Sequence, residues 1–137
     1  MSIERQFSQA APSGDTVLTI GTFDGVHRGH QRLFQRVREE AQARGLQSAA
    51  ITFRNHPRTV VSPGARVEYL TPWPQRKSLI KAQGIEHLVA LEFTKELSLL
   101  KAREFVALLV DQLRMKALVV GPDFALGHRR EGDIDTL

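Results

Sequence analysis

The chain has 137 residues, 42% of them hydrophobic and 25% charged, with no cysteine and a formal net charge of +4. This composition is typical of one globular domain with its own core, and it excludes a disordered chain, disulfides and cysteine-ligated metal sites. No apolar run has the length of a signal peptide or a membrane span, so we expect a cytoplasmic protein without a membrane partner.

Arginine supplies most of the positive charge. Its guanidinium group suits phosphate oxygens, so the charge balance favours a polyanionic small substrate. Nucleic-acid binding is the weaker interpretation, because the basic residues are spread along the chain and are not interleaved with aromatic residues in one patch. We therefore expect no nucleic-acid partner, and the sequence does not indicate an oligomeric state.

The first 15 residues are mostly polar and contain Pro12, Ser13 and Gly14. They predict a flexible lead-in, with a short pairing segment around residues 3–7 as an option. Residues 16–137 are expected to form a single domain, without internal repeats or low-complexity segments. The functional residues are therefore sought in this domain.

The first predicted strand covers residues 17–20, which are apolar or β-branched and are followed by Gly21. A glycine-rich loop comes next. A helix is predicted over residues 31–44, because apolar residues recur there at three- and four-residue spacing before Gly45. A strand, a glycine-rich turn and a helix N-terminus direct main-chain N–H groups and the positive end of the helix dipole to one place. This arrangement favours an anion such as a phosphate.

The same loop carries two histidines, His27 and His30, separated by Arg28 and Gly29. If His30 opens the helix, both rings can face the same side of its first turn, and Gly29 places no side chain between them. A pair of solvated or structural histidines is one interpretation. The stretch GTFDGVHRGH also resembles the HxGH signature of nucleotidylyltransferases, in the form found in prokaryotic FAD synthetases, which are FMN adenylyltransferases. Its glycine spacing fits neither a GxGxxG dinucleotide loop nor a Walker A loop.

A second strand is predicted over residues 48–53, and the succession of strand, helix and strand favours a right-handed parallel crossover. The next loop then lies at the same sheet edge as the first, where parallel α/β sheets bind ligands. His56 and Pro57 in this loop resemble the His-Pro pair of FAD synthetases, which implies a flavin contact; an ordinary surface loop is the alternative. Asn55 stands where the family usually has proline.

Residues 61–74 form an irregular connection with two aromatic residues, Tyr69 and Trp73. The resemblance implies a flap in which one of them stacks on the flavin, and hydrophobic anchoring of the loop is the alternative. The following elements continue the alternation of helices and strands. A short helix is predicted over residues 75–83 and a strand over residues 87–91. A long helix beginning near Lys95 follows, and then a strand over residues 117–120.

A second glycine-punctuated loop follows the last predicted strand and contains Asp123, Phe124 and Gly127. It resembles the Gly-x-(Asp/Asn)-Phe-x-x-Gly segment of FAD synthetases. The resemblance places Asp123 against the phosphate and ribose region of the nucleotide or flavin, and Gly127 in the turn. A tight turn with charged side chains is the alternative.

Taken as a whole, the resemblance implies an α/β Rossmann-like nucleotidylyltransferase fold, with a parallel sheet of four or five strands flanked by helices. It implies that the adenylyl group of ATP is transferred to FMN, giving FAD and pyrophosphate, with Mg²⁺ carried mainly by the ATP phosphates. His27, His30 and Thr22 are the expected catalytic residues. The ATP site is expected to comprise Gly21, Thr22, Phe23, Asp24, His27, Gly29 and His30, and the flavin site His56, Pro57, Asp123, Phe124 and Gly127.

Family members continue beyond the equivalent of Leu137 through a Ser/Thr-rich segment ending in an arginine of the ATP site, and usually into a riboflavin kinase domain. We therefore expect a C-terminally shortened domain without riboflavin kinase activity and with impaired adenylyl transfer. Two alternatives are a related nucleotidylyltransferase with another acceptor or with CTP as donor, and a non-catalytic nucleotide- or flavin-binding module. Nicotinamide mononucleotide and pantetheine phosphate are the other acceptors considered.

Overall fold

A computed structural model of the chain describes residues 3–9, 11–23, 28–54, 73–120, 125–126 and 132–133. Its centre is a four-stranded sheet in the order β3-β2-β1-β4, in which every neighbouring pair is parallel. The strands are β1 (Thr16–Ile20), β2 (Gln47–Phe53), β3 (His87–Leu91) and β4 (Met115–Leu118). Two further strands, β5 (Ala125–Leu126) and β6 (Gly132–Asp133), form a separate antiparallel pair. The prediction of an α/β fold with a parallel sheet is confirmed.

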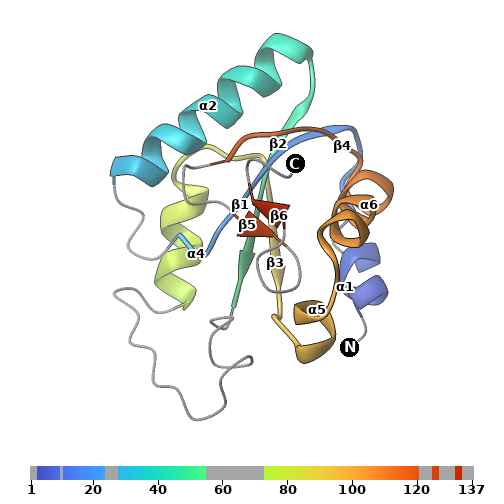
Figure 1. Ribbon diagram of the computed structural model, residues 1–137. Helices are drawn as coiled ribbons and strands as arrows, with labels where there is room; N and C mark the ends of the chain where they lie inside the picture. The colour runs from blue at the N-terminus through green and yellow to red at the C-terminus, as the bar shows by residue number, and fades with distance from the viewer. Residues whose placement is uncertain are drawn as a thin grey trace.

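Helices cover both faces of the sheet (Figure 1). On one face lie α2 (Arg28–Arg44) and α4 (Trp73–Lys81), and on the other α1 (Ile3–Gln9), α5 (Lys95–Ser98) and α6 (Ala102–Gln112). Because strand side chains alternate between faces, β1 contributes to two apolar cores. Val17 packs in the core with Phe34 and Ile80, and Leu18 in the core with Phe105. None of the described helices is long and apolar enough to cross a membrane.

The order of the strands marks a specific place for a ligand. The chain adds β2 and then β3 on one side of β1, and returns to the other side of β1 for β4. The direction of strand addition therefore reverses between β1 and β4. In open parallel α/β sheets, ligands bind in the crevice outside the carboxyl ends of the two strands at such a reversal. Residues 21–23 and 119–120 follow the carboxyl ends of these two strands and lie at the reversal.

The helix after β1 begins earlier than the prediction for residues 31–44. α2 starts at Arg28, so His30 lies inside its first turn and not at its border. The apolar spacing on which the prediction rested begins only at Leu33, since the first turn has the sequence RGHQ and buries no large apolar side chain. Periodicity therefore located the buried stripe of α2 and missed its first turn.

The prediction of one long helix from Lys95 is wrong, because two helices occupy this region. α5 ends at Ser98 and α6 begins at Ala102. Each helix has its own N-terminal hydrogen bond: the Leu97 N–H donates to the Thr94 hydroxyl at 3.1 Å, and the Lys101 N–H donates to the Glu104 carboxylate at 3.0 Å. Such bonds satisfy main-chain donors at a helix start, so they stabilise two short helices in place of one.

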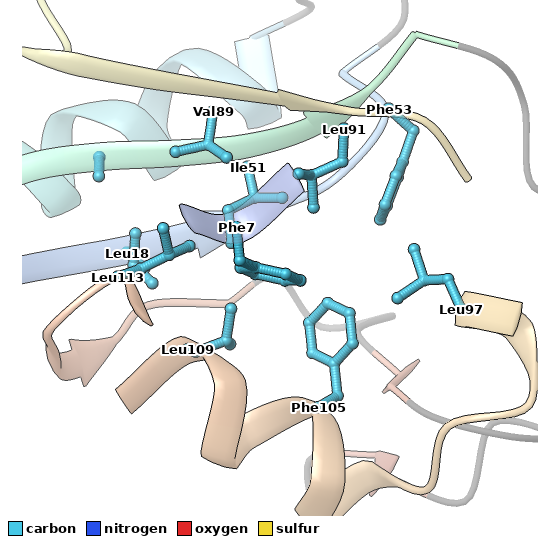
Figure 2. Packing of buried hydrophobic residues seen from close by; sticks show 11 residues of the cluster. Phe7, Leu18, Ile51, Phe53, Val89, Leu91, Leu97, Phe105, Leu109 and Leu113 are labelled. Carbon is cyan, nitrogen blue, oxygen red and sulfur yellow. The ribbon is translucent and has the colours of Figure 1, made fainter. Parts of the chain in front are cut away.

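The prediction of a flexible lead-in is wrong for residues 3–9, which form α1. Phe7 on this helix is 1% exposed, and its ring meets that of Phe105 edge-to-face with centroids 6.0 Å apart. Figure 2 shows Phe7 between the sheet and α6. The Gln6 side chain also accepts a hydrogen bond from the Glu92 N–H at 2.8 Å. One aromatic side chain in a polar segment therefore docks the helix on the core.

Candidate active site

The carboxyl ends of the strands lie at one edge because the sheet is parallel throughout. At this edge the Gly21 N–H donates to the Ile51 carbonyl at 3.0 Å, which continues the ladder between β1 and β2 by one bond. The Val119 N–H donates to the Leu18 carbonyl at 2.8 Å on the other side of β1. The turn after β1 thus starts from a strand that is held on both sides.

Phe23 shapes this turn. Its φ of 54° lies in the left-handed region, which non-glycine residues rarely adopt. Its ring is 2% exposed and contacts two rings of α2: that of Phe34 with centroids 4.7 Å apart, and that of His30 edge-to-face at 5.3 Å. Burial of an aromatic ring offsets the strain of such a backbone. Phe23 therefore ties the turn to the start of α2 and lies directly against His30.

His30 is half-buried in the first turn of α2, next to the positive end of the helix dipole. That turn contains no acidic residue, and Arg28 and Arg32 are exposed on the first two turns. Acidic side chains usually stabilise a helix N-terminus, and arginines there oppose the dipole. The charges at this end of α2 therefore suit an anionic ligand better than they suit the isolated helix.

Gly21 is required by the packing of Phe23. A Cβ atom built on Gly21 lies 2.8 Å from Cε1 and 2.9 Å from Cζ of Phe23, closer than real Cβ contacts. We expect Gly21→Ala to displace the ring from Phe34 and His30, and to lower the free energy of unfolding by about 1–3 kcal/mol. Urea denaturation measures this change.

Gly14→Ala is the matched control for this substitution. Its Cβ would meet the Gln47 side chain at 3.4 Å, an ordinary contact, at the other end of β1. We expect a free energy of unfolding within about 0.5 kcal/mol of the parent chain. Equal stability of the two variants would show that the Phe23 ring moves without cost, and would contradict a tightly packed turn.

The structure brings together five of the residues predicted for the ATP site. Gly21, Thr22 and Phe23 form the start of the turn, and Gly29 and His30 lie in the first turn of α2. The other predicted site residues lie outside the described residues; they are Asp24, His27, His56, Pro57, Asp123, Phe124 and Gly127. Tyr69 lies outside them too.

Two residues that the sequence did not single out as site residues donate hydrogen bonds to main-chain carbonyls at the carboxyl ends of the strands. The Thr52 hydroxyl, fully buried, donates to the Thr22 carbonyl at 3.2 Å. Arg76 of α4 is 1% exposed, and its Nη2 donates to the Phe53 carbonyl at 2.6 Å. The Arg76 guanidinium also lies 5.2 Å from the centre of the Trp73 ring. Threonine is common in strands and arginine is usually exposed, so neither residue type indicates in the sequence that it supports a site.

The chain is similar to known proteins over most of its length. A profile of the family described as FAD synthetase matches residues 9–137. The bifunctional riboflavin kinase/FMN adenylyltransferase of Escherichia coli K12 is 37% identical over 124 residues, which are 90% of this chain and 40% of that protein. The protein of the same name from Pseudomonas fluorescens is 39% identical over 88% of this chain and 39% of its own length. A FAD synthetase of Listeria monocytogenes is 34% identical over 93% of this chain and 53% of its own length.

The chain spans about two fifths of the length of the bifunctional relatives. Among solved structures, a crystal structure described as a macrolide-efflux protein from Streptococcus pneumoniae has a TM-score of 0.84 and 27% identity, over 92% of this chain and 42% of that chain. This likeness covers the fold described above. Because the family profile extends over nearly the whole sequence, the chain belongs to the FAD synthetase family.

Proposed function

We propose that this chain transfers the adenylyl group of ATP to FMN, giving FAD and pyrophosphate. The observation that carries the proposal is the placement of Thr22, Phe23 and His30 at the strand reversal, in a chain of the FAD synthetase family. Its relatives bear the name FMN adenylyltransferase.

The reaction needs no protein nucleophile. A phosphate oxygen of FMN attacks the α-phosphorus of ATP, the bond from that phosphorus to the oxygen of the β-phosphate breaks, and pyrophosphate leaves. The protein therefore accelerates the step by holding the two phosphates in line and by stabilising the charge that develops on their oxygens. Groups that donate hydrogen bonds at a fixed place suit this task.

We assign these tasks to the residues of the turn and of α2. The His30 imidazole and the start of α2 would bind the ATP phosphates, and the Thr22 hydroxyl the reacting phosphate. We also propose that His27 contacts the ATP phosphates and that Asp24 orients the loop, on the resemblance of the stretch GTFDGVHRGH alone. His56, Pro57, Asp123, Phe124 and Gly127 are proposed for the flavin because their segments resemble the His-Pro pair and the Gly-x-(Asp/Asn)-Phe-x-x-Gly segment of FAD synthetases.

Magnesium is proposed to accompany ATP. Gly21, Thr22, Phe23, Gly29 and His30 offer a hydroxyl, an imidazole and main-chain groups, and none of them carries a carboxylate. Mg²⁺ prefers oxygen ligands and commonly binds through substrate phosphates. These residues therefore fit a metal that is held chiefly by the ATP phosphates, where it would neutralise part of their charge.

Calorimetric titration with ATP, FMN and FAD, followed by a pyrophosphate-release assay, tests the proposal. We expect ATP and FMN to bind, and pyrophosphate to appear only when FMN is the acceptor. Release with nicotinamide mononucleotide or pantetheine phosphate in place of FMN would assign another acceptor. Binding without release under any of these conditions would identify a nucleotide- or flavin-binding module and contradict the proposed reaction.

A further inference from the structure

The Thr22 carbonyl is held by a side chain and not by the sheet ladder. The last main-chain bond between β1 and β2 in this direction joins the Gly21 N–H to the Ile51 carbonyl. One residue later, the Thr52 hydroxyl donates to the Thr22 carbonyl at 3.2 Å. The peptide between Thr22 and Phe23 therefore depends on Thr52 for its orientation at the point where the ladder stops.

The conformation of the next residue makes this orientation important. Phe23, the residue after the Thr22 carbonyl, has a φ of 54°, in the left-handed region that non-glycine residues rarely adopt. Another orientation of the peptide between Thr22 and Phe23 needs a different ψ at Thr22 and a different φ at Phe23, so it would alter the backbone at Thr22 and the placement of the Phe23 ring against His30. Thr22 and His30 belong to the proposed phosphate site.

The strand end that follows Thr52 is held from two sides. The next two residues of the chain make bonds in other directions: the Arg54 N–H donates to the Leu91 carbonyl of β3 at 2.9 Å, and Arg76 of α4 donates to the Phe53 carbonyl at 2.6 Å. The end of β2 is thus joined to β3 and to α4. A donor on such a fixed strand end can set the position of an adjoining turn.

We propose that Thr52 is a positioning residue for adenylyl transfer, which acts through its hydrogen bond to the Thr22 carbonyl. It does not touch the substrates. It holds the peptide between Thr22 and Phe23 so that the Thr22 hydroxyl meets the reacting phosphate, and this inference rests on the proposed function. Loss of the bond should reduce a contact made in the transition state, which lowers kcat more than it changes the KM for ATP.

Thr19 offers a matched control in the neighbouring strand. Thr19 and Thr52 are both fully buried, and alternation along β1 and β2 places both on the sheet face that packs against α2. Within the described residues, the Thr19 hydroxyl has no hydrogen-bond partner. Threonine to valine exchanges a hydroxyl for a methyl group of similar size, so the two variants differ in whether a hydrogen bond to the turn is lost.

The experiment compares Thr52→Val with Thr19→Val in the pyrophosphate-release assay with FMN and ATP. We expect kcat to fall about ten- to a hundredfold in Thr52→Val, with the KM for ATP nearly unchanged, and to stay at the parent value in Thr19→Val. Thr52→Ser keeps the hydroxyl and should restore turnover, whereas Thr52→Ala should not. Equal kcat for the two valine variants, or equal loss in Thr52→Ser and Thr52→Ala, would overturn the proposal.

A second measurement separates this inference from the proposed function. The amide resonance of Phe23 reports on the peptide between Thr22 and Phe23, and it needs no substrate. We expect it to shift in Thr52→Val and to stay in place in Thr19→Val. If the parent chain releases no pyrophosphate, the proposed function fails, and an unchanged Phe23 resonance in Thr52→Val would overturn the positioning role on its own.

Discussion

Replacement of His30 by alanine is expected to lower adenylyl transfer about 10²–10³-fold, which is the typical cost of removing one donor to the charge of a transition state. The imidazole lies in the first turn of α2, at the strand reversal and beside the Phe23 ring. Alanine keeps the helix and removes the donor. The rate of pyrophosphate release with FMN and ATP measures the effect, and circular dichroism checks that the fold is retained.

His87→Ala is the matched control for this prediction. His87 is the first residue of β3, so it lies at the edge of the sheet opposite the carboxyl ends of the strands. We expect parent turnover from this variant. Full turnover in His30→Ala, or an equal loss in the two variants, would contradict the assignment of His30 to the ATP phosphates.

Replacement of Phe7 by alanine is expected to lower the free energy of unfolding by about 3–5 kcal/mol. The ring is 1% exposed and lies among Leu18, Phe105 and Leu109 of the core (Figure 2). Alanine leaves a cavity there and removes the aromatic contact between α1 and α6. Urea denaturation followed by circular dichroism measures the loss.

Ser8→Ala on the same helix provides the comparison, because Ser8 is exposed. Its free energy of unfolding should stay within about 0.5 kcal/mol of the parent value. If Phe7→Ala were as stable as Ser8→Ala, α1 would not be part of the core, and the sequence-based interpretation of residues 1–15 as a lead-in would apply to this segment after all.

The sheet could be predicted from the sequence because its strands are short apolar runs that end at glycine or polar residues. The predicted strand over residues 87–91 has the bounds of β3. The last strand was predicted over residues 117–120, but β4 spans Met115–Leu118. The apolar run there extends past the paired segment, and its pairing with β1 shifts register between Thr16 and Val17, which periodicity alone does not reveal.

The candidate site could be predicted only where a motif marks it. Gly21, Thr22 and His30 belong to a stretch with a recognisable spacing, and the structure places them at one sheet edge. Thr52 and Thr19 are both threonines in buried strands, so nothing in the sequence distinguishes the one that holds the turn. That distinction depends on which main-chain group each hydroxyl meets in three dimensions.

A titration of the ¹⁵N-labelled chain with MgATP, followed by the main-chain amide resonances, tests most directly whether the triphosphate binds at the strand reversal. Binding at this crevice predicts the largest shifts in residues 21–23, 28–31 and 119–120, which flank the carboxyl ends of β1 and β4. Unchanged resonances in these segments, with shifts gathered at Leu46, Glu86 and Arg114 beyond the opposite edge of the sheet, would contradict the proposed site.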